Sequence, residues 1–186
     1  DESIVFQVLA DKNNSSHPDL IVLVVDATNL RRNLLLYTQV ADLGIPVVMA
    51  LNMMDMANRE GIAIAVDKLS ERLGIRIVPI SARGNIGISQ LKDALGNYSD
   101  IATQTEGADV RALAPEAISL AKAHLKSNND YLALQVLHQH QYLNTFDVED
   151  HQRFEKIKSD HKFDSAKLQA AETISRYRYL GTVLSG

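Results

Sequence analysis

The sequence predicts an α/β domain, built on a parallel sheet with flanking helices and followed by a small all-helical bundle. Two observations predict this fold class. From Leu20 to about Asn97, short β-branched apolar runs alternate with longer stretches of helical spacing, as in consecutive parallel βα units. After Tyr98, strand-like runs disappear and several helix-start signals follow one another. A chain of 186 residues can hold two such domains.

Three strands are expected in the α/β part, at Leu20–Val25, Val47–Leu51 and Ile75–Ile80. Their apolar residues follow one another without a polar alternation. This pattern is typical of parallel strands that helices cover on both faces. We therefore expect both faces of all three strands to be buried.

Helices are expected between the strands and after them. Helical apolar spacing covers Leu30–Leu43, Val66–Leu73 and Ile88–Leu95. Near the start of the chain, Ile4–Leu9 predicts a short amphipathic helix, and the polar stretch Asp11–His17 predicts a surface loop.

The second part of the chain begins with a polar linker at Thr103–Gly107. Turn-forming and helix-capping residues then mark the helix starts. We expect these starts at Pro115, Asp130, Asp147 and Asp164-Ser165, with the last helix running to about Val183. Each helix carries an apolar stripe, so about four helices are expected to pack as a small bundle.

Composition excludes several classes of protein. The formal net charge is −4 and the basic residues are scattered, so the basic patch of a nucleic-acid-binding protein is absent. There is no cysteine, which excludes disulfides and thiolate metal sites. The longest apolar run, Leu20–Val25, is far shorter than the roughly 20 residues that a membrane helix needs. The opening Asp1-Glu2-Ser3 does not resemble a secretion signal, and we expect the chain to begin within a domain.

The strongest functional signal follows the second strand, where Val47–Leu51 leads into Asn52-Met53-Met54-Asp55. Ligands of parallel α/β sheets bind at the carboxyl ends of the strands. Guanine presents a ring N–H and an exocyclic amine side by side, and one carboxylate can accept from both. Asp55 is placed to do so, whereas adenine would leave polar groups unpaired. Asn52 is expected to brace the loop.

A second polar segment follows the next strand, at Ser81-Ala82-Arg83-Gly84. Because Ala82 is small, the backbone can approach a base, and its N–H can donate to the guanine carbonyl oxygen. The pairing of the two segments carries more weight than either alone, since Asn-x-x-Asp occurs by chance in many chains.

Weaker candidates have simpler explanations. Asp26, at a strand end, is expected to accept hydrogen bonds from nearby backbone N–H groups rather than to be phosphorylated. His138, His140 and His151 are expected to lie on solvated helices and not to bind a metal, because i and i+2 positions point to different sides of a helix. Two alternatives stay open: a receiver-like domain with Asp26 as acceptor, and a non-catalytic α/β interaction module.

The α/β part resembles the bacterial ferrous-iron transport protein B family. The resemblance is carried by Val24–Leu34, Leu43–Pro46, Leu51–Asp55 and Ser81-Ala82. It implies that residues 1–102 are the C-terminal half of a GTPase domain with a partial P-loop GTPase-like sheet, and that residues 103–186 are a helical regulatory domain. By resemblance, Asn52, Met53 and Asp55 contact the base, as do Ser81, Ala82 and Arg83. Met53 stands where many GTPases carry a lysine and would lie against the purine face.

The resemblance also implies a setting for the chain. The family's polypeptides continue into a membrane transporter domain for Fe²⁺, so we expect this segment at the cytoplasmic face of the bacterial inner membrane. GTP hydrolysis by the whole protein would regulate Fe²⁺ uptake. Homo-oligomer formation stays open.

One family feature is absent from the sequence. No Gly-x-x-x-x-Gly-Lys-Ser/Thr segment is present, and phosphoryl transfer depends on that segment and on Mg²⁺. We therefore expect an upstream half of the GTPase domain as a partner and Mg²⁺ only together with it. Binding of GTP or GDP by these residues alone is expected to be weak or absent, and GTP hydrolysis is not expected.

Overall fold

A computed structural model describes residues 6, 8–9, 14–97 and 108–185, which form two compact units. The α/β unit holds Pro18 to Asn97 and Arg176 to Ser185, and the helical unit holds Ala108 to Ser175 and the described residues up to His17. Residues 6, 8 and 9 of the predicted first helix are helical. The rest of that helix and the linker at Thr103–Gly107 lie outside the described residues, as does the predicted domain boundary after residue 102.

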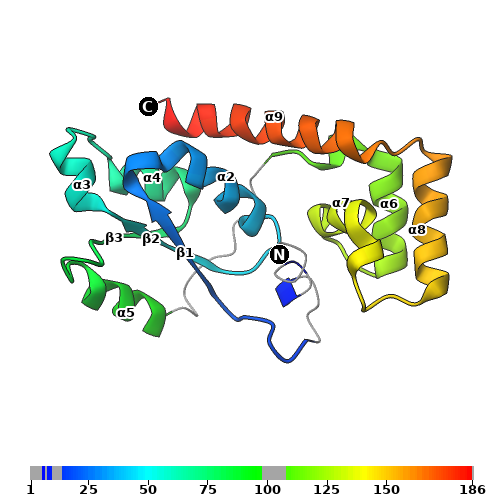
Figure 1. Cartoon of the computed structure of the whole chain (residues 1–186), viewed down its shortest axis with the longest axis horizontal. Coiled ribbons are helices and arrows are strands. Elements are labelled where there is room, and N and C mark those ends of the chain that lie inside the picture. Colours follow the sequence, from blue (N-terminus) through cyan, green and yellow to red (C-terminus); the bar gives the residue numbers. More distant parts are fainter. Residues whose placement is uncertain (1–5, 7, 10–13, 98–107, 186) are drawn as a thin grey trace. The chain divides into compact units, whose positions relative to one another are not determined.

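The α/β unit contains a parallel sheet of three strands in the order β1-β2-β3 (Figure 1). The strands are β1 (Ile21–Asp26), β2 (Val47–Asn52) and β3 (Arg76–Pro79). All three predicted strands are confirmed to within a residue or two at their ends. The parallel arrangement brings the ends of all three to one edge of the sheet.

Helices cover the sheet from both sides (Figure 1). On one face lie α2 (Leu30–Ala41), which follows the short 3-10 helix η1 (Ala27–Asn29), and α4 (Val66–Leu73). The other face carries α5 (Ile88–Gly96). A further helix, α3 (Met54–Arg59), follows β2 directly and was not predicted, because six residues are too few to show a helical period.

The expectation that both faces of every strand are buried is wrong for β1, and also for the two ends of β3, where Arg76 and Pro79 are exposed. Leu23 and Val25 are buried in the core beneath α2 and α4, but Val22 is 38% exposed and Val24 is 61% exposed on the opposite face. The helix on that face, α5, packs mainly on β2 and β3. The apolar run in β1 therefore predicted the strand correctly but not its environment.

The helical unit contains the four predicted helices. They are α6 (Pro115–Leu125), α7 (Asp130–Gln139), α8 (Val148–Asp160) and α9 (Ser165–Leu184), together with the 3-10 turns η3 (Arg111–Leu113) and η4 (His140–Tyr142). The predicted start signals are confirmed. Asn129 caps α7 by accepting from the Leu132 N–H at 2.8 Å, and Asp147 forms a capping box with Asp150 at the start of α8.

The last helix differs from the prediction, because α9 contributes to both units. Its apolar stripe was expected to pack entirely in the helical bundle. Instead Leu180 and Val183 are buried in the core of the α/β unit, and Ile174 is 59% exposed. A helix of 20 residues is about 30 Å long, so it can continue past the shorter helices of the bundle. Within the described residues, no helix is both long and apolar enough to cross a membrane.

Candidate functional site

The candidate site is formed by two loops that leave the ends of neighbouring strands. β2 ends at Asn52 and β3 at Pro79, and the register places Leu51 opposite Pro79. The Ile80 N–H donates to the Leu51 carbonyl at 2.8 Å, and the Met54 N–H donates to the Ile80 carbonyl at 3.3 Å. These bonds continue the contact between the strands past their ends, so the two loops are held next to each other.

Met53 sets the direction of the first loop. Its backbone is left-handed, with φ 63° and ψ 27°, and it directly precedes α3. A residue other than glycine adopts this conformation rarely and at some cost in free energy, usually where the surrounding structure enforces it. The sharp turn puts Asp55 in the first turn of α3, beside the strand ends.

The second loop is closed on itself. The N–H groups of Ser81 and Ile86 each donate to the other residue's carbonyl at 3.0 Å, and the Gly84 N–H lies 3.3 Å from the Ser81 Oγ. Gly87 follows with φ +76°, and a Cβ added there would lie 2.3 Å from the Pro79 carbonyl oxygen. Glycine is required at this position because the backbone passes too close to β3 for any side chain.

Asn52 joins the two loops. Its side-chain Oδ1 accepts the Ala82 backbone N–H at 3.0 Å. The predicted bracing role of Asn52 is therefore seen in the structure. The same bond changes the expectation for Ala82, because the N–H that was to donate to a guanine carbonyl already has a protein acceptor. The sequence showed that Ala82 was small but not where its N–H pointed.

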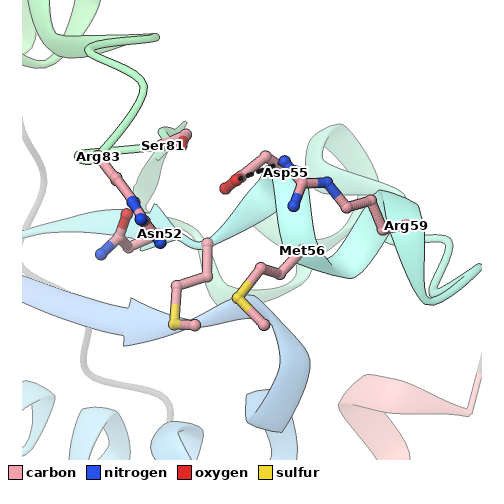
Figure 2. Close-up of a pocket in the computed structure, with 7 residues that line it drawn as sticks. Asn52, Asp55, Met56, Arg59, Ser81 and Arg83 are labelled. Atoms are coloured by element: carbon pink, nitrogen blue, oxygen red, sulfur yellow. Dashed lines mark ion pairs between the residues drawn. The ribbon is translucent and has the colours of Figure 1, made fainter.

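A pocket of about 410 Å³ opens between the two loops and α3 (Figure 2). Its lining consists of Asn52, Met53, Asp55, Met56, Arg59, Ser81 and Arg83. The structure thus brings five of the six predicted base-contacting residues to one pocket. Ala82 does not line it. Figure 2 shows the Asp55 carboxylate directed toward the side of the pocket where Asn52, Ser81 and Arg83 lie.

Asp55 is held in its ionised form. A hydrogen bond from the Ser81 side chain is the main cause that lowers the pKa of Asp55 below its usual value, and the positive charge of Arg59 acts in the same direction. The guanidinium NH2 of Arg59 lies 3.7 Å from Asp55 Oδ2, across one turn of α3. The pocket therefore offers a carboxylate that can accept hydrogen bonds at neutral pH.

Two pocket residues were missed in the sequence. Met56 lies next to Asp55 and is partly exposed at the pocket, and Arg59 follows Asp55 by four residues. The spacing of Asp55 and Arg59 was a readable signal, since i and i+4 residues of opposite charge pair on a helix. Using it would have required predicting α3.

Asp26 behaves as predicted. Its Oδ1 accepts from the Thr28 N–H and from the Thr28 hydroxyl, both at 2.8 Å. This arrangement caps η1. Asp26 is therefore a loop-stabilising acceptor.

Two of the three histidines that were expected to lie on solvated helices, His138 and His140, are buried, so that expectation is wrong for them. His138 is 9% exposed and packs against Phe163, with ring centroids 5.0 Å apart. His140 is buried, with its Nδ1 3.0 Å from His151 Nδ1 and its Nε2 3.0 Å from Glu155. His138 and His140 do point to different partners, as predicted. Across the described ranges, no group of three or more His, Asp or Glu side chains is arranged to hold a metal ion.

Comparison with known sequences identifies the family of this chain. The profile described as "Ferrous iron transport protein B" matches residues 1–95. The Fe(2+) transporter FeoB of Escherichia coli K12 is 43% identical over 108 residues, which cover 58% of this chain and 14% of the transporter. That of Salmonella typhimurium is 46% identical over 85 residues, covering 46% of this chain and 11% of the transporter. The chain thus spans about one seventh of the length of such relatives.

Solved structures resemble the chain over most of its length. The cytosolic domain of L. pneumophila FeoB aligns with a TM-score of 0.72 at 26% identity, covering 95% of this chain and 69% of that one. An S. thermophilus NFeoB mutant bound to GDP aligns with a TM-score of 0.69 at 28% identity, covering 98% of this chain and 73% of that one. The likeness therefore includes the helical unit as well as the sheet.

Proposed function

The chain belongs to the ferrous iron transport protein B family, and from this premise we propose that it carries the guanine-recognition loops and the helical regulatory domain of an Fe²⁺ transporter. The proposed location is the cytoplasmic face of the bacterial inner membrane, with the transporter domain in the same polypeptide. A solved relative at 28% identity is bound to GDP, which supports a guanine nucleotide as the ligand.

The observation that carries the proposal is the position of the Asp55 carboxylate. It lines a 410 Å³ pocket next to the loop that holds Ala82, and hydrogen bonding keeps it ionised. In our proposal the two oxygens of Asp55 accept from the ring N–H and from the 2-amino group of guanine. Adenine has no such pair of donors on that edge, so the carboxylate would lose hydrogen bonds to water without replacement.

The other site residues have supporting roles in this proposal. Asn52 holds the Ala82 loop beside the base, and Ser81 orients the Asp55 carboxylate. Met53 and Arg83 line the pocket and would contact the faces and edge of the purine. The sulfur of Met53 is polarisable and suits contact with an aromatic ring. Ala82 supplies its N–H to the guanine carbonyl oxygen if it exchanges Asn52 for the base.

Phosphate binding is assigned to another segment of the same protein. The sequence has no Gly-x-x-x-x-Gly-Lys-Ser/Thr loop, whose backbone N–H groups and lysine would hold the phosphates. We propose that such an upstream half of the GTPase domain is the partner of this chain and that Mg²⁺ binds with it. Hydrolysis of GTP would then require both parts, and nucleotide binding by this chain alone would be weak.

The helical part is proposed to regulate nucleotide binding. The supporting observation is that α9 belongs to both units, with Leu180 and Val183 in the core of the α/β unit. A change in the packing of this helix would alter the packing of the sheet that carries the site. We propose residues 1–102 and 103–186 as the two functional domains.

A change of nucleotide base tests the assignment of Asp55 as the residue that recognises guanine. In a polypeptide that includes this chain and a phosphate-binding loop, Asp55→Asn is expected to lose preference for GDP and to gain binding of xanthosine diphosphate. The reason is that an amide can accept from the ring N–H and donate to the 2-oxo group of xanthine. The affinities of both nucleotides are measured by isothermal titration calorimetry. Asp93→Asn, an exposed acid on α5, is the matched control and should leave both affinities unchanged.

If Asp55→Asn keeps the original affinity for GDP, the assignment of Asp55 as the base-recognition residue is refuted. A parallel loss of binding for every nucleotide, accompanied by a loss of helical and sheet signal in circular dichroism, would mean unfolding. The gain of xanthine binding is the outcome that unfolding cannot produce.

A further inference from the structure

Arg59 already contacts the carboxylate that is proposed to bind the base. Its NH2 group lies 3.7 Å from Oδ2 of Asp55, and both side chains line the same pocket (Figure 2). The Arg59 side chain is 78% exposed and that of Asp55 is 33% exposed. The pair is therefore accessible to a ligand and can be broken at little cost.

The two oxygens of Asp55 are needed together for one purine and not for another. Guanine has a ring N–H and a 2-amino group on the same edge, so bidentate binding uses both oxygens. Hypoxanthine has the ring N–H but lacks the 2-amino group, so it uses one oxygen. The second oxygen can then keep its contact with Arg59.

We propose that Arg59 is a specificity-determining residue, which competes with the 2-amino group of guanine for Oδ2 of Asp55. This assignment rests on the proposed function. The 2-amino group of guanine and the guanidinium of Arg59 both present positively polarised N–H groups to Oδ2 and repel each other there, whereas hypoxanthine brings no second donor to that oxygen. Arg59 therefore weakens the binding of guanine and leaves that of hypoxanthine unchanged. The affinities for the two bases then differ less than they would without Arg59.

The size of the effect follows from the kind of ion pair. Exposed pairs at i and i+4 on a helix shift an equilibrium by roughly twofold. The Ser81 side chain also lowers the pKa of Asp55, but it is the same with either base and so does not distinguish them. Salt screens an exposed pair, so the contribution of Arg59 should decrease as ionic strength rises.

The experiment compares guanosine and inosine 5′-monophosphates, which differ in the 2-amino group and carry the same phosphate. Each is titrated into the 186-residue chain at millimolar concentrations, and binding is followed by ¹H–¹⁵N NMR shifts of the residues in the two loops. The variants are Arg59→Gln and Arg59→Lys. Lys92→Gln removes an exposed positive charge from α5 and serves as the control for net charge.

We expect Arg59→Gln to strengthen guanosine monophosphate binding about twofold and to leave inosine monophosphate unchanged, apart from any shift that Lys92→Gln also produces. Arg59→Lys should stay close to the original protein, because an ammonium can hold the same oxygen. The twofold difference should fall in 0.5 M salt. If Arg59→Gln leaves the ratio of the two affinities unaltered or lowers it, the assignment of Arg59 is overturned.

Failure of the proposed function gives a different result. In that case Asp55→Asn would not alter the response to guanosine monophosphate, and both proposals would fall. A response that depends on Asp55 but not on Arg59 removes the inference about Arg59 alone.

Discussion

Acid should destabilise the helical unit through His138. The side chain is 9% exposed, and neither ring nitrogen has a hydrogen-bond partner among the described residues. Burial, together with the nearby charge of Lys158, lowers the pKa of His138 from 6.5 to about 4. The native state therefore resists protonation at pH values where the unfolded chain accepts a proton.

The direction of the effect follows from which state binds more protons. Between pH 6.5 and about 4 the unfolded state holds the proton and the native state does not, so the free energy of unfolding decreases as pH falls through this window. The total loss is about 3 kcal/mol, because each pKa unit corresponds to roughly 1.4 kcal/mol. From pH 7 to pH 5 the loss is about 2 kcal/mol. Burial also lowers the pKa of His140, so its contribution has the same sign.

His138→Leu removes the titrating group and keeps a side chain of similar size. We expect the loss of unfolding free energy between pH 7 and pH 5 to shrink by about 2 kcal/mol in this variant. Urea unfolding followed through the NMR signals of α7 amides gives the stability of this unit at each pH. His161→Gln, at an exposed position after α8, is the control. If His138→Leu shows the same pH dependence as the original chain, the reasoning from burial is refuted.

Two further predictions concern the α/β unit. Gly87→Ala should lower the free energy of unfolding by at least about 1 kcal/mol and shift the NMR signals of residues 81–86, because φ is +76° and the new Cβ would lie 2.3 Å from the Pro79 carbonyl oxygen; unchanged stability would show that the loop can move away without cost. Arg176→Met should cost about 3 kcal/mol in urea unfolding, because Arg176 is 0% exposed and lies 2.8 Å from Asp42. Adding Asp42→Leu to Arg176→Met should recover part of that loss, and a double variant no more stable than the single one would contradict an ion-pair origin.

The sequence predicted the strands and helix starts well because their signals are local. The strand β2 could be placed from its apolar run alone, since all its residues up to Leu51 are buried. Asp147 acts on a backbone group within three residues, so composition near a helix start is sufficient to find it. At α7 the capping residue is Asn129, one position before the predicted Asp130. Asp26 and Thr28 form a similarly local contact.

The errors arose where the environment depends on distant residues. Val24 and Val25 are both apolar, but Val24 is exposed because α5, the helix on its face of the sheet, packs mainly on β2 and β3. His138 is buried because Phe163, from another part of the chain, packs on it. Likewise, the second half of α9 packs into the core of the α/β unit, and apolar spacing alone does not indicate which core a helix contacts.

In the candidate site, too, features set by local residues were predicted and features set by distant residues were not. Asp55 and Asn52 were found because strand ends are readable and a carboxylate is a distinctive hydrogen-bond acceptor. That Asn52 accepts the Ala82 N–H could not be predicted, since it depends on the geometry of two loops 30 residues apart. The pairing of Arg59 with Asp55 was missed because α3 itself was missed.

These contacts bear on how tightly a base can bind. The groups proposed to recognise guanine already have protein partners, because Ala82 donates to Asn52 and Asp55 is contacted by Ser81 and Arg59. Base binding would then exchange hydrogen bonds rather than add them, and an exchange between well-made bonds yields a small net free energy. The two loops that follow β2 and β3 would therefore provide selectivity, because a base other than guanine would not replace the hydrogen bonds that its binding breaks. Most of the affinity would have to come from contacts to the phosphates, which is why we assign phosphate binding to a segment that contains the loop missing from this sequence.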